Sequence, residues 1–212
     1  MKVQTKSKKV NKAWLNDHVN DPYVKLAQKE GYRARAAYKL KEIDETLHLI
    51  KPGHLVVDLG CTPGAWSQYV RRRLSPSGAA VGALDGTIIG LDLLAMEPIE
   101  GVQFIQGDFR EDAVLAQLQQ ALQGRMADVV VSDMAPNLSG VALTDQVRGI
   151  HLAELALEFA CDKLASDGRF VVKVFQGSGF MEFRKAMEQA FAKVEVRKPK
   201  ASRDRSAEVY LL

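Results

Sequence analysis

Short apolar runs, separated by glycine, proline and charged residues, recur along the chain. The run at 55–57 is followed by Asp58 and then by a turn with the sequence GCTPG. This pattern predicts a buried strand that ends at Asp58, and residues 65–74 continue with the apolar spacing of a helix. A strand, a glycine turn and a helix form the first unit of a doubly wound sheet, in which ligands bind beyond the carboxyl ends of the strands.

Strand-like and helix-like segments alternate over the rest of the chain. Helices are predicted over 22–30, 34–47, 112–122, 144–164 and 179–190. Strands are predicted over 88–92, 102–105, 127–132 and 169–175, with a terminal antiparallel hairpin over 194–196 and 208–212. This order predicts an α/β fold: a single doubly wound, Rossmann-like domain over 21–212 with a mostly parallel seven-stranded sheet. Residues 1–20 are predicted to be a basic, partly disordered N-terminal extension.

The segment 75–90 departs from this regular order. It contains two similar pieces, AVGALD and TIIGLD, which end in Asp85 and Asp92. The second strand of a doubly wound sheet is expected to end in an acidic residue that binds ribose hydroxyl groups. Both aspartates have a suitable spacing, but Ile88 and Ile89 are the better strand residues and favour Asp92. Residues 81–86 would then be an insertion, either a loop or an extra hairpin arm.

Composition narrows the class of protein. The apolar fraction of 47% is ordinary for a globular domain, and no apolar run approaches the length that spans a membrane. The basic N-terminus lacks the apolar stretch of a secretory signal. Cys61 and Cys161 are the only cysteines, which favours reduced thiols and a cytoplasmic protein over a disulfide framework or a metal site. Cys61 lies inside the glycine turn, where a small filling residue is a simpler interpretation than a nucleophile.

Basic residues are concentrated at the two ends of the chain. Residues 1–41 hold 11 basic and 3 acidic residues, and residues 193–205 hold 6 and 2, whereas the remainder holds 12 and 21. Basic side chains interleaved with tyrosines, as in 32–41, suit phosphate contact and base stacking, although a basic helix packed on the core is the alternative. Together the two ends favour nucleic acid as a partner. The predicted RNA contacts are Lys12, Arg33, Arg35, Arg197, Lys198, Arg203 and Arg205.

The glycine turn indicates the chemistry of its ligand. Gly60 and Gly64 do not have the G-x-G-x-x-G spacing of a dinucleotide site, which disfavours a nicotinamide-dependent oxidoreductase. With Asp58 just before it, the turn suits a ligand that carries a cationic amino-acid group. The segment D-L-G-x-x-P-G-x-W-S resembles the S-adenosylmethionine loop of the FtsJ-like methyltransferases. The resemblance implies that this cofactor binds to Asp58, Gly60, Gly64, Trp66, Asp92, Asp108 and Asp133, with Asp92 on its ribose and Asp108 on its adenine.

Charged residues lie in or at the end of three apolar strands: Asp133, Lys173 and Glu208. A lysine centred in a buried parallel strand is costly unless it is paired. Because adjacent strands of a parallel sheet end side by side, Asp133 and Lys173 are expected to meet at the carboxyl edge, and Glu208 can join them from the hairpin. A buried ion pair without a catalytic role is the alternative for each residue.

With Lys39, these three residues resemble the K-D-K-E tetrad of the 2′-O-ribose methyltransferases. The segments SDMAPN, FVVKVFQG, RKPxxSR and S-x-E-V-Y extend the resemblance to the FtsJ-like rRNA methyltransferases of the large ribosomal subunit, over about 14–210. The resemblance implies a domain that uses S-adenosylmethionine to methylate the 2′-hydroxyl of a uridine in the A-loop of 23S rRNA, on the large ribosomal subunit. It implies catalytic roles for Lys39, Asp133, Lys173 and Glu208. We expect a monomer.

The implied reaction explains these residue types. A ribose 2′-hydroxyl is a poor nucleophile at neutral pH, so the enzyme must align its oxygen with the methyl group and help its proton to leave. A neutral amine on Lys173 can accept that proton, and the second cation, Lys39, favours the neutral form. Alternatively, Lys173 steers the hydroxyl lone pair while water takes the proton. A noncatalytic RNA-binding assembly factor is the other function considered, and the intact tetrad disfavours it.

Overall fold

The computed structural model describes residues 19–137 and 139–212. Its centre is a seven-stranded sheet with the order β3-β2-β1-β4-β5-β7-β6. The strands are β1 (Leu55–Leu59), β2 (Thr87–Asp92), β3 (Val102–Gln106), β4 (Ala127–Ser132), β5 (Leu164–Phe175), β6 (Val196–Arg197) and β7 (Glu208–Leu211). The first five strands pair in parallel, and β7 is antiparallel to both β5 and β6. The predicted doubly wound sheet and its C-terminal hairpin are confirmed.

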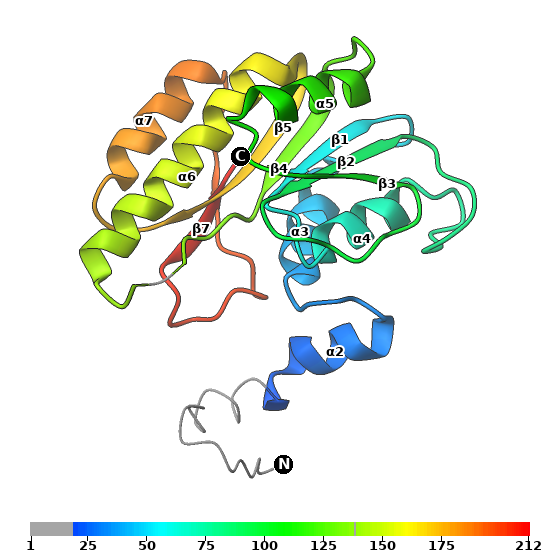
Figure 1. Cartoon of the computed structure of the whole chain (residues 1–212). Helices are drawn as coiled ribbons and strands as arrows, with labels where there is room; N and C mark the ends of the chain where they lie inside the picture. Colours follow the sequence, from blue (N-terminus) through cyan, green and yellow to red (C-terminus); the bar gives the residue numbers. More distant parts are fainter. Residues whose placement is uncertain (1–18, 138) are drawn as a thin grey trace.

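Helices cover both faces of the sheet (Figure 1). One face carries α3 (Ala37–Leu47) and α4 (Ala65–Arg73), and the other carries α5 (Asp112–Leu122), α6 (Ala142–Lys163) and α7 (Phe180–Ala190). Alternate residues of one strand point to opposite faces, so Val56 packs in the core under α3 and α4 while Val57 packs under α5, α6 and α7. Strands that are buried on both faces explain the continuous apolar runs of the sequence. The remaining helix, α2 (Pro22–Glu30), extends away from the sheet.

Several boundaries differ from the prediction. β1 continues through Asp58 to Leu59, so Asp58 lies inside the strand and does not end it. α3 begins at Ala37, because residues 34–36 form a turn that offers the Ala36 carbonyl to the indole N–H of Trp66 at 2.8 Å. α6 starts two residues earlier and β5 five residues earlier than predicted.

The insertion before β2 is a loop and not a hairpin arm. The buried guanidinium of Arg71 holds this loop, since it donates to the carbonyl oxygens of Gly82 at 2.6 Å and Glu100 at 3.0 Å. Asp85 lies ahead of β2, where its backbone N–H donates to the Leu74 carbonyl at 2.8 Å. It is therefore at the opposite end of this strand from Asp92.

None of the helices within residues 19–137 and 139–212 is long and apolar enough to cross a membrane. Lys12 and residues 1–18 of the predicted N-terminal extension lie outside the described residues.

Candidate active site

The carboxyl ends of β4 and β5 bring Asp133 and Lys173 together. Ser132 pairs with Val172 in the parallel register, so the two residues that follow lie side by side. Lys173 Nζ is 3.1 Å from Asp133 Oδ1 and donates to the Asp133 carbonyl oxygen at 2.6 Å. Lys173 is only 8% exposed, so its ammonium depends on these partners in place of water. The meeting of these two residues at the sheet edge, expected from sequence, is confirmed.

The C-terminal hairpin and α3 complete the cluster. β7 places Tyr210 opposite Lys173, and the Tyr210 hydroxyl donates to Asp133 Oδ1 at 2.7 Å. Glu208 Oε1 lies 2.8 Å from Lys39 Nζ, which reaches from α3 over the Tyr210 ring at 5.8 Å from its centroid. The four residues predicted from sequence, Lys39, Asp133, Lys173 and Glu208, therefore gather at one place and are called the tetrad below.

The tetrad keeps Asp133 ionised and Tyr210 protonated. Burial by itself would raise the pKa of Asp133, but the charges of Lys173 and Lys39 and the hydrogen bond from Tyr210 outweigh it, and the pKa lies below its ordinary value. Burial, followed by the charges of Asp133 and Glu208, raises the pKa of Tyr210 well above its ordinary value. Both shifts favour a Tyr210 hydroxyl that donates to an ionised Asp133 carboxylate.

A cavity of about 300 Å³ opens beside Asp133 and is called the cofactor cavity below. Carboxylates from the ends of β2, β3 and β4 reach its wall, together with glycine backbone and apolar side chains. The residues that matter here are Gly60, Asp92, Asp108, Phe109, Asp133 and Leu152. Gly60 has a φ of 73°, and a Cβ there would lie 2.4 Å from Met134 Cγ, so the turn requires glycine at this point.

Protein donors already orient the carboxylates of the cavity wall. The N–H groups of Thr62 and Leu94 donate to the two oxygens of Asp92, both at 2.8 Å. The Arg110 side chain donates hydrogen bonds to both carboxylate oxygens of Asp108. These hydrogen bonds hold the pKa of Asp108 below its usual range. Asp85 is not part of this wall. The placement supports Asp92 as the acidic residue that faces the ligand.

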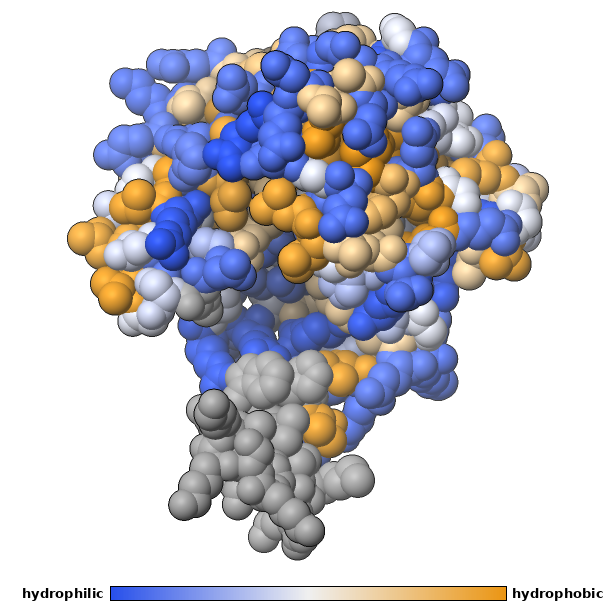
Figure 2. All heavy atoms as spheres, in the orientation of Figure 1, coloured by the Kyte–Doolittle hydropathy of each residue, from blue (hydrophilic) through white to orange (hydrophobic). Residues whose placement is uncertain are grey.

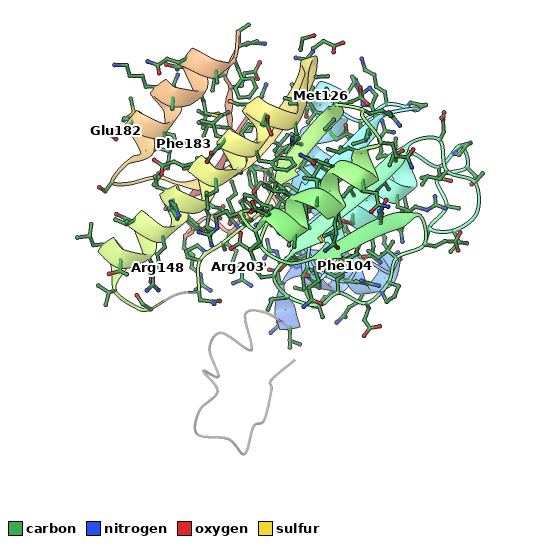
Figure 3. The ribbon with its side chains drawn as sticks, turned by 45° about the horizontal axis from the view of Figure 1, so that its top comes forward. Phe104, Met126, Arg148, Glu182, Phe183 and Arg203 are labelled. Atoms are coloured by element: carbon green, nitrogen blue, oxygen red, sulfur yellow. The ribbon has the colours of Figure 1, made fainter. Side chains whose placement is uncertain are left out.

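The other end of the tetrad lines a second cavity, of about 480 Å³, which we call the basic hollow. Lys39 and Glu208 lie in its wall with Arg35, Arg203 and Arg205. Figure 2 shows hydrophilic side chains around a hollowed surface where α2 meets the body of the domain, and Figure 3 places Arg203 along the lower edge of the domain. The tetrad thus contributes Asp133 to one cavity and a Lys–Glu pair to the other.

This arrangement of sheet, glycine turn and tetrad can be compared with known proteins. The model of the FtsJ-like methyltransferase family matches residues 32–212. The chain belongs to this family. Members of the family use S-adenosylmethionine. In doubly wound folds, ligands bind beyond the carboxyl ends of the strands, which is where the cofactor cavity lies.

Relatives of this chain are similar over its full length. The ribosomal RNA large subunit methyltransferase E of Acidovorax sp. (strain JS42) is 69% identical over 100% of this chain and 96% of its own length. The protein with the same name from Paracidovorax citrulli (strain AAC00-1) is 67% identical over 100% and 97%. A crystal structure of a putative ribosomal RNA methyltransferase from Plasmodium falciparum superposes with a TM-score of 0.73 at 31% identity, over 85% of this chain and 96% of that chain.

Three of the predicted cofactor residues do not line the cofactor cavity: Asp58, Gly64 and Trp66. Trp66 is buried in the core with its indole on the Ala36 carbonyl. Asp58 is also buried, and its Oδ2 accepts the Ser67 hydroxyl at 2.7 Å while its Oδ1 has no partner among the described residues. Burial, against the hydrogen bond from Ser67, raises the pKa of Asp58 to about 7. Burial also raises the pKa of the Cys61 thiol, as expected for a residue that only fills the turn.

The predicted RNA contacts divide into two groups. Arg35, Arg203 and Arg205 line the basic hollow. The others within the described residues do not line the hollow: Arg197 pairs with Glu195, Lys198 donates to the Ser206 carbonyl at 2.6 Å, and Arg33 donates to three carbonyl oxygens at and beside the glycine turn. Arg35 lines the hollow and also pairs with Asp21. The hollow is therefore built from residues that come from both ends of the chain.

Tyr210 and Asp21 are absent from the predicted site. Tyr210 has a local signal, because it lies two residues after Glu208 in a strand and must share its face. Asp21 caps α2 through the Tyr23 N–H at 2.9 Å and also pairs with Arg35. Only the cap can be predicted from the sequence, because the ion pair depends on how the chain folds between Asp21 and Arg35.

Proposed function

We propose that this protein transfers a methyl group from S-adenosylmethionine to the 2′-oxygen of a uridine ribose in the A-loop of 23S rRNA, on the large ribosomal subunit. One observation carries the proposal: the tetrad joins a cofactor cavity to a basic hollow. The names of the full-length relatives supply the ribosomal substrate. We further propose that the protein acts as a monomer, since one chain provides both cavities and the whole tetrad. We also propose that it acts in the cytoplasm.

The cofactor cavity fits S-adenosylmethionine in its chemistry. Asp92 offers a carboxylate for ribose hydroxyl groups, Asp108 offers one for the adenine amine, and Gly60 allows the backbone to approach the ligand closely. The cofactor, when bound, supplies a methyl group that its sulfonium has already activated. The protein therefore needs only to align the acceptor oxygen and manage its proton.

Lys173 and Lys39 perform these two tasks in the proposed reaction. Asp133, which lines the cofactor cavity, and Tyr210 fix the Lys173 amine behind this wall, and from there the amine takes the hydroxyl proton or orients the hydroxyl lone pair. Glu208 fixes the Lys39 amine at the wall of the basic hollow, where it can hold the ribose. Arg35, Arg203 and Arg205 provide positive charge for the neighbouring phosphates.

Methyl transfer to rRNA is the direct test. The protein is incubated with radiolabelled S-adenosylmethionine and with naked 23S rRNA, isolated large subunits or whole ribosomes from cells that lack the modification. Alkaline hydrolysis then separates ribose from base methylation, because only a 2′-O-methyl group protects the following phosphodiester bond. Label in an alkali-resistant dinucleotide that contains uridine supports the proposal. Binding to particles without label would instead favour the noncatalytic assembly factor.

The cofactor site has its own test. Asp92→Ala should weaken S-adenosylmethionine binding at least about tenfold, because a hydrogen bond to a charged group is worth roughly 1.5–3 kcal/mol. Asp85→Ala is the matched control and should leave the affinity unchanged, since Asp85 lies at the other end of β2. If calorimetry instead shows a loss of affinity for Asp85→Ala and none for Asp92→Ala, Asp85 and not Asp92 binds the ribose of the cofactor.

A further inference from the structure

Arg33 contacts two segments whose other residues line the cofactor cavity, whereas the nearby Arg35 lines the basic hollow. Its guanidinium donates from Nη1 to the carbonyl oxygens of Pro63 at 2.9 Å and Glu97 at 2.6 Å, and from Nη2 to that of Pro98 at 2.9 Å. Pro63 belongs to the glycine turn, and the other two residues belong to the loop that follows Asp92. One side chain therefore binds two segments that are far apart in sequence.

The main chain around Arg33 is fixed as well. Gln68, on α4, accepts the backbone N–H of Arg33 at 2.8 Å and donates to the Gly31 carbonyl at 3.1 Å. α4 is the helix that begins directly after the glycine turn. Hydrogen bonds to Gln68 thus hold the backbone of residues 31–33 against α4, independently of the Arg33 guanidinium.

Gly64 shows how tightly this unit is packed. Its φ is 108°, and a Cβ there would lie 3.0 Å from Arg33 Nη1 and 2.6 Å from Ile99 Cδ1. The positive φ therefore disfavours any side chain at the second glycine of the turn, and the ends of the Arg33 and Ile99 side chains occupy the space beside it.

We propose that Arg33 is a positioning residue for cofactor binding and not an RNA contact. It cross-links the turn that carries Gly60 to the loop that follows Asp92, and so it fixes the relative position of two segments whose residues Thr62 and Leu94 line the cofactor cavity. A planar guanidinium presents its donors as a rigid fork that reaches acceptors on both segments, which the single ammonium of lysine cannot reproduce. A phosphate that bound Arg33 would have to compete with these carbonyls. The inference rests on the proposed cofactor site.

Arg33→Ala, Arg33→Lys and the matched control Arg203→Ala test this proposal, because each alanine variant removes one guanidinium. S-adenosylmethionine binding is measured by calorimetry without RNA, and binding to an A-loop hairpin RNA is measured over a range of salt concentrations. Arg33→Ala should raise the Kd for the cofactor about tenfold, with partial recovery in Arg33→Lys, and should leave the salt slope of RNA binding unchanged. Arg203→Ala should leave the cofactor Kd unchanged and flatten the salt slope by roughly one unit.

Kinetics separate positioning from general damage. In Arg33→Ala the KM for S-adenosylmethionine should rise while kcat at saturating cofactor and the KM for rRNA stay near those of the wild type. Gln68→Ala, which releases only the main-chain tie, should give a smaller loss of cofactor affinity, and it replaces Arg33→Ala should that variant fail to fold.

An unchanged cofactor Kd in folded Arg33→Ala, with a flatter salt slope, would overturn the proposal and return Arg33 to the RNA contacts. Wild-type protein that binds no S-adenosylmethionine would instead contradict the proposed function, so the two failures are distinguishable.

Discussion

Two buried clusters of charge share helix α3, and only one of them lines the two cavities described above. Asp44, near the end of α3, is fully buried, and its carboxylate accepts hydrogen bonds from the Ile50 N–H at 2.8 Å, the Tyr69 hydroxyl at 2.7 Å and the Arg73 guanidinium at 2.8 Å. Lys39, earlier in the same helix, belongs to the tetrad, which lines the cofactor cavity and the basic hollow.

The difference between these clusters lies in what their polar groups still have to bind. Both oxygens of Asp44 accept hydrogen bonds from protein donors on α4 and in the segment after α3, and Asp44 lines neither the cofactor cavity nor the basic hollow, so this cluster joins elements of the fold. In the tetrad, the Lys39–Glu208 pair and Asp133 also face open space. Burial of charge alone is therefore weak evidence for an active site, and contact between buried charge and a cavity is much stronger evidence.

The largest expected effect is at Lys173. Lys173→Ala should lower kcat by roughly 10²–10⁴-fold, because proton transfer and orientation are lost, while the Kd for S-adenosylmethionine stays near that of the wild type. Lys173→Arg should be almost as inactive, since a guanidinium remains protonated and cannot accept a proton. Calorimetry and single-turnover methylation measure the two quantities. Near wild-type turnover by a folded Lys173→Arg protein would limit Lys173 to positioning.

Asp44→Ala should give the opposite pattern. It leaves the Tyr69 hydroxyl and the Ile50 N–H without their buried acceptor, so the free energy of unfolding should fall by roughly 3 kcal/mol. Urea denaturation measures this loss, and methylation per folded molecule at low temperature should match the wild type. A large fall in kcat would break the distinction between the two clusters.

Each cluster contains one tyrosine that donates to its aspartate, and this pair sharpens the comparison. Tyr210→Phe should lower kcat roughly tenfold, because Asp133 then holds Lys173 less firmly. Tyr69→Phe should leave kcat unchanged and lower the free energy of unfolding by roughly 1.5 kcal/mol. Equal effects of the two variants on kcat would show that the clusters are not functionally distinct.

Asp58, a third buried carboxylate, should give an effect on stability that depends on pH. Its pKa is raised to about 7, so the folded protein holds this proton more tightly than the unfolded chain, whose aspartates have pKa values of about 3.9. The stability from this group is present at low pH and is lost as the pH rises through that window. Asp58→Asn should therefore become more stable relative to the wild type as the pH rises from about 4 to about 7. A constant difference in the free energy of unfolding would contradict the raised pKa.

The sequence by itself determined the order of strands and helices along the chain, the glycine turn and three members of the tetrad, while Lys39 was identified through the family resemblance. These features depend on local patterns: apolar runs predict buried parallel strands, and a charge inside such a run must find a partner. The side-by-side ends of β4 and β5 then follow from the parallel sheet, which is why the meeting of Asp133 and Lys173 could be predicted.

Only the tertiary structure decided what the individual basic and acidic side chains contact. Arg33 and Arg35 are close in sequence and identical in chemistry, yet one binds carbonyls beside the cofactor cavity and the other lines the basic hollow. Asp58 is buried away from the cavity, while Asp92 reaches it. A side chain binds the groups that folding brings within hydrogen-bond distance. For these residues those groups come from distant segments, so no local pattern records them.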